Sequence, residues 1–215
     1  MALSSDTSMS VDWRSRCLTS LLRFGFAVGG RCVPSLATGA AVWLFTKPRR
    51  SLATSDEEEL LTHATSSYLA HGNEELNVMA WGNGPTVLCV HGWSSRGLRF
   101  LPLIRSLSEV GYRVVVFDAP AHGRSSGSQV DLMEFAEAVH AVAKSIGPID
   151  ALVAHSFGAA ASLHALERGL ECKKVVFLSG LNGLRGPLDY MAKRRRIPAR
   201  KTLVFSRPLV PGTGR

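Results

Sequence analysis

Cysteine is scarce in this chain of 215 residues, and its four cysteines, Cys17, Cys32, Cys89 and Cys172, show no paired spacing. The sequence therefore gives no sign of a disulfide framework, and a reducing, cytoplasmic compartment fits this pattern best. The chain also lacks Cys or His pairs at the spacing of metal ligands, and no glycine-rich phosphate loop follows a strand pattern. We predict neither a metal site nor a cofactor.

Long apolar runs are missing as well. Residues 17–46 are mostly apolar, but Arg23 and Arg31 interrupt them, and the longest uncharged run, 32–46, is shorter than the ~20 residues of a membrane-spanning helix. Apolar residues at helical spacing near the start of this stretch predict an amphipathic helix. We expect this helix to pack on the protein itself, since its polar face is not rich in lysine, and the alternative is peripheral contact with a membrane.

Acidic residues are absent from the last part of the chain. The net charge is +8, but eight of the 25 Lys and Arg residues lie in 193–215, a stretch without Asp or Glu. The other 17 basic residues balance the 17 acidic ones, so the rest of the chain is neutral. A neutral body argues against a protein that grips nucleic-acid phosphates over a broad face, and we expect no nucleic-acid partner. We interpret 191–215 as a basic, disordered tail.

Strand and helix patterns alternate through the middle of the chain. Ser55 and Glu58 are expected to form a capping box, and the helix that they begin is expected to end at Gly72. Strand patterns, most of them continuously apolar, follow at 75–82, 86–92, 112–120, 150–156 and 173–180. Helical patterns with a glycine near their ends lie between the later strands, at 97–111, 130–147 and 157–170.

This alternation predicts an α/β fold, a mostly parallel sheet with flanking helices, plus an N-terminal helical extension. We place the extension at 1–72, the α/β core at 73–190 and the tail at 191–215. After Gly180 the regular pattern stops, and only "TLVF" at 202–205 has the composition of a further short strand.

Ser156 stands where the strand pattern "ALVAH" meets the helix pattern "FGAAAS". A sharp turn from strand to helix requires small neighbours, and Ala154 and Gly158 supply them. Such a turn would lift the serine hydroxyl to the carboxyl end of the sheet and aim the first helical N–H groups, beginning with that of Phe157, at a bound ligand. Taken alone, the same pattern also fits a serine that merely ends a strand or caps a helix.

Two further polar stretches favour the catalytic interpretation. "HGWSS" at 91–95 follows the first buried strand, and "DAPAHGRSSG" at 118–127 follows the second. With "AHSFGA" at 154–159, they resemble the α/β-hydrolase superfamily, in the branch with an H-G-x oxyanion loop, a D-x-P-x-H-G-x-S loop and a serine elbow. The matching residues are His91, Gly92, Trp93, Asp118, Pro120, His122, Gly123, Ser125, His155, Ser156, Phe157 and Gly158. The sequence departs from the pattern at Ala121 and Ala154, where the family usually has glycine.

The resemblance implies a serine hydrolase that cleaves ester, thioester or related acyl bonds of a small-molecule substrate through an acyl-enzyme. Ser156 would be the nucleophile, and the backbone N–H groups of Phe157 and Trp93 would hold the developing oxyanion. We expect the side chain of His155 to be packed, because it points away from the nucleophile on a strand-like backbone. The residues expected to shape the loops, without taking part in the chemistry, are His91, Gly92, Asp118, His122, Gly123, His155 and Gly158.

The partners of the serine are not evident. In this superfamily the acid and the histidine follow the nucleophile in the chain. The only histidine after Ser156 is His164, eight residues along the same helix and therefore about 12 Å away. The only later aspartate is Asp189. We interpret the chain as a truncated, weak or inactive relative of an active hydrolase, lacking the C-terminal part of the fold. The alternative is a non-catalytic protein that binds a partner or membrane through its N-terminal helix or its basic tail.

Overall fold

A computed structural model describes residues 35, 39, 43, 46–50 and 53–178, together with the backbone of 202–205. The chain divides into two compact units, Met1–Phe45 and Thr46–Arg215, and the sheet belongs to the second. The amphipathic helix expected within 17–46 and most of the tail expected at 191–215 lie outside the described residues. Both remain predictions.

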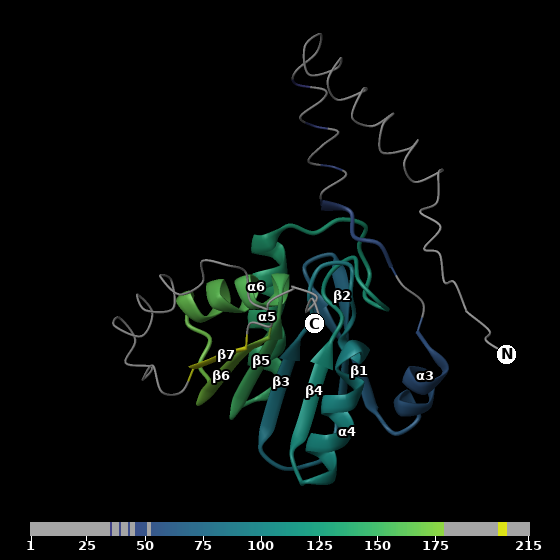
Figure 1. Cartoon of the computed structure of the whole chain (residues 1–215). Helices are drawn as coiled ribbons and strands as arrows, with labels where there is room; N and C mark the ends of the chain where they lie inside the picture. The colour runs from purple at the N-terminus through teal and green to yellow at the C-terminus, as the bar shows by residue number, and fades with distance from the viewer. Residues whose placement is uncertain are drawn as a thin grey trace, which may run out of the picture. The chain divides into compact units, whose positions relative to one another are not determined.

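The second unit is built on a sheet in which the strands stand in the order β1-β2-β4-β3-β5-β6-β7 (Figure 1). The strands β4, β3, β5, β6 and β7, which are neighbours in that order, run parallel to one another. Strands β1 and β2 run antiparallel to their neighbours. The bounds are Thr65–His71 for β1, Glu74–Trp81 for β2, Thr86–Val90 for β3, Arg113–Phe117 for β4, Ala151–His155 for β5, Lys174–Leu178 for β6 and Thr202–Phe205 for β7. The predicted mostly parallel sheet is confirmed, and the "TLVF" strand is its edge strand β7.

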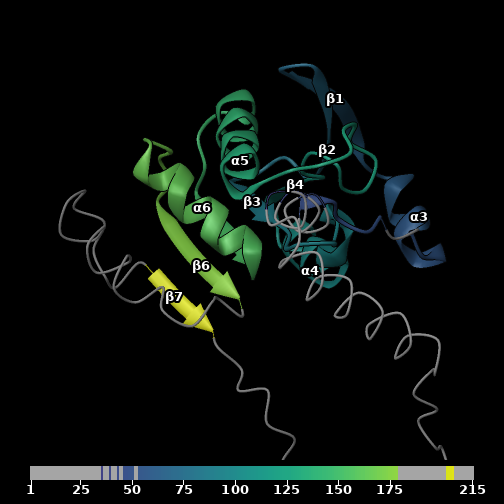
Figure 2. The same cartoon turned by 90° about the horizontal axis from the view of Figure 1, so that it is seen from above.

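Helices cover both faces of this sheet, as Figure 2 shows from above. Helices α5 and α6 lie side by side on one face, and α4 lies on the other. The bounds are Ser55–Leu61 for α3, Gly97–Phe100 for the 3-10 turn η1, Leu101–Glu109 for α4, Leu132–Ile146 for α5 and Phe157–Glu167 for α6. Two layers of helices around one sheet confirm the expected α/β class.

The core consists of two apolar clusters, one on each face of the sheet. Strand β4 shows how they are filled: Val115 and Phe117 join the cluster under α5 and α6, whereas Val114 and Val116 join the cluster under α4. All four side chains are fully buried. Because successive strand residues point to opposite faces, a strand covered on both sides must be apolar at every position, which explains the continuous apolar runs of the sequence.

The helix expected between Ser55 and Gly72 was wrong in its second half. Helix α3 ends at Leu61, and β1 follows and pairs antiparallel with β2. Gly72, at φ +59°, serves the hairpin turn between these strands and does not cap a helix. The cap itself lies one residue earlier than predicted, since Thr54 and Glu57 form the capping box. Pairing along the sheet overrides the helical spacing of a short segment whose polar residues suit either structure.

Candidate active site

The candidate site lies at one edge of the sheet, where parallel strands end together. Strands β3, β4 and β5 are neighbours and parallel, so their carboxyl ends meet. The loops that follow them contain the three stretches singled out in the sequence. This edge of an open parallel sheet is where ligands commonly bind.

Ser156 occupies the sharp turn between β5 and α6. Its backbone has φ 51° and ψ −119°, a conformation that non-glycine residues rarely adopt and that costs about 1–3 kcal/mol. The turn is held by two hydrogen bonds: the Ser156 N–H donates to the Leu178 carbonyl at 3.1 Å, and the Ala159 N–H donates to the Ser156 carbonyl at 2.9 Å. The strained elbow expected from the sequence is therefore present in the backbone.

Glycines let the loop after β3 touch the elbow. A Cβ atom on Gly158 would lie 2.2 Å from the His91 carbonyl oxygen, so the first turn of α6 fits against the end of β3 only without a side chain. A Cβ atom on Gly92 would lie 3.2 Å from the Cβ of Ser156. The loop after β3 therefore runs directly beside the elbow.

Both alanines that replace family glycines are accommodated. Ala154 is fully buried in β5, between β3 and β6, where its methyl group fits into the core. Ala121 has a left-handed backbone at φ 61° and donates its N–H to the Ser126 carbonyl at 2.8 Å.

The side chains of the two residues expected to donate to the oxyanion lie in contact. The rings of Trp93 and Phe157 meet edge to face, with centroids 5.2 Å apart. Within the described part of the chain, neither backbone N–H donates a hydrogen bond to another backbone group outside the helices and strands. Phe135, from α5, supports this pair at 5.6 Å from the Phe157 ring. Phe135 was not singled out in the sequence, where it is one apolar residue within the helical pattern at 130–147.

His91 and His122 cross-link the loops after β3 and β4. His91, in the first loop, accepts the Ala119 N–H at Nε2 (3.0 Å), and its Nδ1 lies 2.7 Å from the Gly92 carbonyl oxygen. Because Nε2 accepts, Nδ1 must carry the proton and donate it. His122, in the second loop, makes the reciprocal contact, since its Nε2 accepts the Ser94 N–H at 3.0 Å.

Both imidazoles are held in their neutral form. Burial lowers the pKa of His91, and it lowers the pKa of His122 to about 4. A neutral imidazole accepts a hydrogen bond at one nitrogen and donates one from the other, whereas both nitrogens of a charged imidazole are donors. Both Nε2 atoms are occupied by backbone N–H groups, so these histidines shape the loops and are not placed to take a proton from Ser156.

Asp118 is a second centre of loop contacts. Its carboxylate accepts the Gly97 N–H at 2.8 Å, the Arg124 N–H at 2.9 Å and the Asn77 side-chain amide at 3.1 Å. Gly123, at φ 46°, passes so close that a Cβ atom on it would lie 2.2 Å from the carboxyl carbon. A carboxylate with three donors and 3% exposure organises its surroundings and faces no substrate.

The sequence profile of the Alpha/beta hydrolase family matches residues 87–214, which is more than half of the chain. The chain belongs to this family. The match covers the elbow and both loops described above. A search of curated proteins found no match.

Solved structures similar to this α/β hydrolase include two kinds of hydrolase. The thioesterase domain from the curacin biosynthetic pathway is 28% identical, with a TM-score of 0.51, over 60% of this chain and 54% of that domain. An epoxide hydrolase from Vigna radiata is 26% identical, with a TM-score of 0.51, over 55% of this chain and 41% of that protein. A mutant epoxide hydrolase from Solanum tuberosum is 25% identical, with a TM-score of 0.50, over 54% and 40%. The chain thus spans about half of the thioesterase domain and about two fifths of the epoxide hydrolases.

Two further histidines, His155 and His164, belong to the strand and the helix that flank Ser156. His155 is exposed, in contrast to its expected packed position. It lines a cavity of about 340 Å³ together with His91, Ser95, Arg99, Phe100 and Leu178. His164, on α6, lies 3.6 Å from the Glu167 carboxylate. Asp189 falls outside the described residues.

Two negative findings concern only the described residues. Among them, no group of three or more His, Cys, Asp or Glu side chains is placed to hold a metal ion. No helix within the same part of the chain is long and apolar enough to cross a membrane. Cys89 and Cys172 are free thiols, and burial raises their pKa to about 12 and about 11.

The segment before β1 also reaches the site loops, which sequence analysis did not foresee. Arg50 donates from its two terminal nitrogens to the carbonyl oxygens of Gly123 and Gly127, at 2.9 and 2.8 Å. Glu57 pairs with Arg96 in the loop after β3. The only local signal for either contact was the capping box, which was predicted with Glu58 and is formed by Glu57.

Proposed function

We propose that this α/β hydrolase cleaves ester, thioester or related acyl bonds, with Ser156 as the nucleophile. The observation that carries the proposal is the strained backbone of Ser156 at the start of α6, with the loop after β3 directly beside it. Strain of this kind persists where the surrounding structure holds it, and it gathers at functional sites. It presents the hydroxyl at the edge of the sheet where the loops converge.

The chemistry follows from this arrangement. The Ser156 Oγ attacks the acyl carbon and gives up its proton to a base, while the N–H groups of Trp93 and Phe157 donate to the oxyanion. The leaving alcohol or thiol takes a proton, and water then releases the acid and restores the serine. Each oxyanion donor is worth about 2.7–4 kcal/mol in comparable sites.

The relatives divide between a thioesterase and epoxide hydrolases, and the identity of the nucleophile favours acyl chemistry here. A serine that opened an epoxide would form an ether to the protein, which water does not readily hydrolyse. A serine that attacks an acyl carbon forms an ester, which water can hydrolyse. The thioesterase domain is therefore the more informative relative for this site.

We further propose that the chain by itself turns over weakly or not at all. The only histidine after Ser156 is His164, which faces Glu167, and both loop histidines already accept N–H groups. Without a base the hydroxyl is a weak nucleophile. The oxyanion donors can still accelerate the reaction to a small extent.

The test is labelling with a fluorophosphonate probe, with and without added imidazole. We expect slow labelling of the folded protein, none of Ser156→Ala or of the unfolded chain, and a rate that rises with imidazole concentration, because the free base replaces the missing one. Labelling that is equal in Ser156→Ala would refute the assignment of the nucleophile. A folded protein that never labels, even with imidazole, would favour the non-catalytic alternative, in which the chain binds a partner or a membrane.

A further inference from the structure

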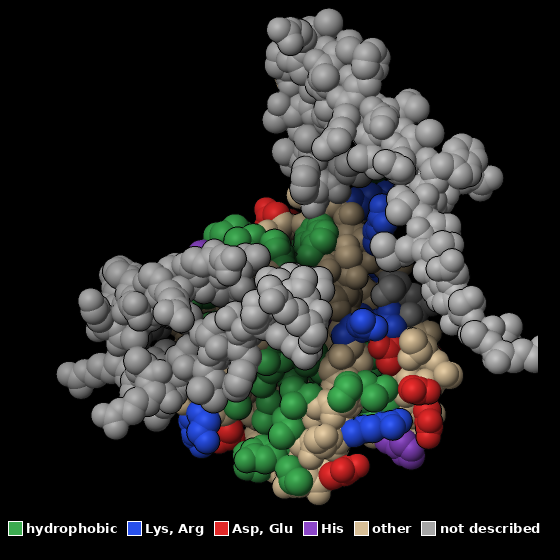
Figure 3. Space-filling model, in the orientation of Figure 1, with side chains coloured by type: hydrophobic (Ala, Val, Ile, Leu, Met, Phe, Trp, Pro, Cys, Tyr) green, Lys and Arg blue, Asp and Glu red, His purple; other side chains and the backbone are tan. Residues whose placement is uncertain are grey.

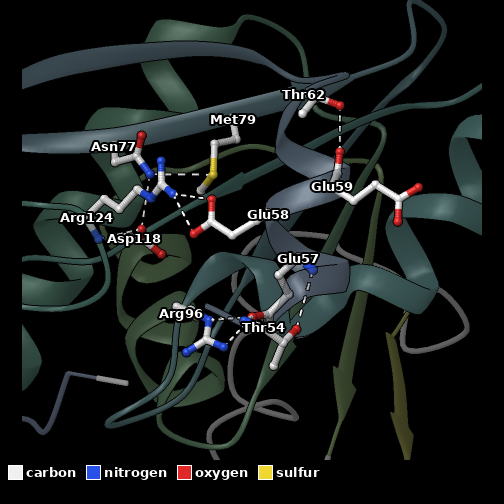
Figure 4. Close-up of polar contacts among 10 residues, drawn as sticks. All are labelled: Thr54, Glu57, Glu58, Glu59, Thr62, Asn77, Met79, Arg96, Asp118 and Arg124. Carbon is white, nitrogen blue, oxygen red and sulfur yellow. Dashed lines mark hydrogen bonds and ion pairs between the residues drawn. The ribbon is translucent and has the colours of Figure 1, made fainter. Parts of the chain in front are cut away.

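A buried ion pair ties helix α3 to the loop that carries Trp93. Glu57 lies in α3 and Arg96 lies in the loop after β3, and their side chains are only 5% and 6% exposed. The Arg96 Nε donates to Glu57 Oε2 at 3.1 Å, and the Nη2 donates to the same oxygen. Figure 4 shows the guanidinium facing the carboxylate. Two donors on one planar group fix its orientation as well as its distance.

The same carboxylate closes the N-terminus of α3. Glu57 Oε2 also accepts the Thr54 N–H at 2.8 Å, and Thr54 Oγ1 accepts the Glu57 N–H at 3.4 Å. The capping box and the ion pair therefore share one oxygen atom. Because of this sharing, the start of α3 and the position of Arg96 are set together.

The loop that contains Trp93 is held by hydrogen bonds at Ser94, before Arg96, and at Gly97, after it. The Gly97 N–H donates to Asp118, as described above, and the Arg49 N–H donates to Ser94 Oγ at 3.0 Å. Trp93 directly precedes Ser94. Small shifts of this loop would therefore move the N–H that is to hold the oxyanion.

The segment before β1 holds the loop after β4 in the same way. The two donors of Arg50 bind the carbonyl oxygens of Gly123 and Gly127, and Arg124 Nη2 lies 2.8 Å from both carboxylate oxygens of Glu58. Neighbouring glutamates of α3 thus pair with arginines from the two loops that flank the elbow (Figure 4). Of these pairs, only Glu57–Arg96 is buried.

We propose that Glu57, through Arg96, is a positioning residue that sets the Trp93 N–H against the Ser156 hydroxyl. A buried ion pair contributes little net stability, because desolvation offsets its attraction, but it defines geometry. Glu57 touches neither substrate nor nucleophile, so it acts through the loop alone. The kinetic part of this inference rests on the proposed function, whereas the structural part does not.

The experiment compares Glu57→Gln with Glu59→Gln in the full chain. Both variants remove one negative charge from α3, but Figure 4 shows the Glu59 carboxylate pointing away from the pair. The rate of fluorophosphonate labelling is measured against probe concentration to separate the maximal rate from probe binding, with imidazole present throughout. Amide hydrogen exchange of the peptide containing 93–97 is measured in parallel, and urea unfolding shows how stable each variant is. Arg96→Lys keeps the charge without the planar fork, and it replaces Glu57→Gln if that variant does not fold.

We expect Glu57→Gln to lower the maximal labelling rate about tenfold or more, with probe binding unchanged, and to speed exchange at 93–97. Glu59→Gln should match the wild type in both. If Glu57→Gln labels at the wild-type maximal rate, or if 93–97 exchange only as global stability predicts, the positioning role is wrong. If the wild type itself does not label, the proposed function fails, and faster exchange confined to Glu57→Gln and Arg96→Lys would still support the fixing of the loop.

Discussion

At the scale of single residues, Ser156 stores strain that the rest of the elbow must hold. Glycine would adopt the positive φ of this position without strain. The Ser156 side chain makes no capping hydrogen bond to α6. Ser156→Gly and Ser156→Ala both remove the hydroxyl, so their difference isolates the strain of the Cβ atom.

We expect Ser156→Gly to be more stable than Ser156→Ala by about 1 kcal/mol, because only glycine adopts this conformation freely. Urea unfolding of both variants measures the difference. Equal stability of the two would show that the elbow is not strained in solution.

Gly158 gives a second prediction at this scale. A Cβ atom there would meet backbone oxygens of Val90 and His91 at 2.7 and 2.2 Å, and backbone atoms cannot swing aside. Gly158→Ala should therefore destabilise the fold by about 3 kcal/mol. Gly111→Ala is the matched control, since its φ is +89° but nothing lies within 4 Å of the added Cβ. A cost of about 1 kcal/mol is expected for the control, and a similar cost at Gly158 would contradict the close contact.

At the scale of elements, the loops after β3 and β4 depend on each other through neutral histidines. Unfolded His122 takes up a proton near pH 6.5, whereas in the folded protein its pKa is about 4 because of burial. Between these values the unfolded state binds more protons, so stability falls as the pH is lowered from about 6.5 to about 4.

This one group should cost about 3 kcal/mol of stability over that pH range. Urea unfolding at several pH values should show a smaller loss for His122→Gln than for the wild type, although the variant is less stable at pH 7. An unchanged slope in His122→Gln would mean that the ring is already protonated in the native state.

At the scale of the whole molecule, protection should decrease from the middle of the sheet to the β1 edge. Every residue of β3 is buried, and β3 pairs on both sides, with β4 and β5. β1 pairs only with β2 in the described structure, and most of its side chains are exposed.

Amide exchange of β3 should therefore be limited by global unfolding, whereas β1 should exchange by local opening and at least tenfold faster. Hydrogen exchange read by mass spectrometry compares the two strands directly. Equal protection of β1 and β3 would indicate that the outer edge of β1 is covered in solution.

Much of the fold could be predicted because its signals are local. The apolar runs of β3 and β4 and the amphipathic spacing of α5 follow from burial on both faces or on one. The elbow could be predicted because Gly158 follows Ser156 at a fixed spacing and two further motifs follow the preceding strands. The region from Ser55 to Gly72 was mispredicted, because pairing of β1 with β2 outweighs a weak local preference.

The sequence by itself determined the order of strands and helices from β2 onward, the resemblance to the family, and the identity of the candidate nucleophile, since each depends on neighbours in the chain. Only the tertiary structure decided which side chains meet. His91 and His122 cross-link two loops because the parallel strands β3 and β4 bring their carboxyl ends together. Glu57 of α3 pairs with Arg96, 39 positions along the chain. Contacts of this kind depend on the geometry of the whole sheet, and no local pattern encodes them.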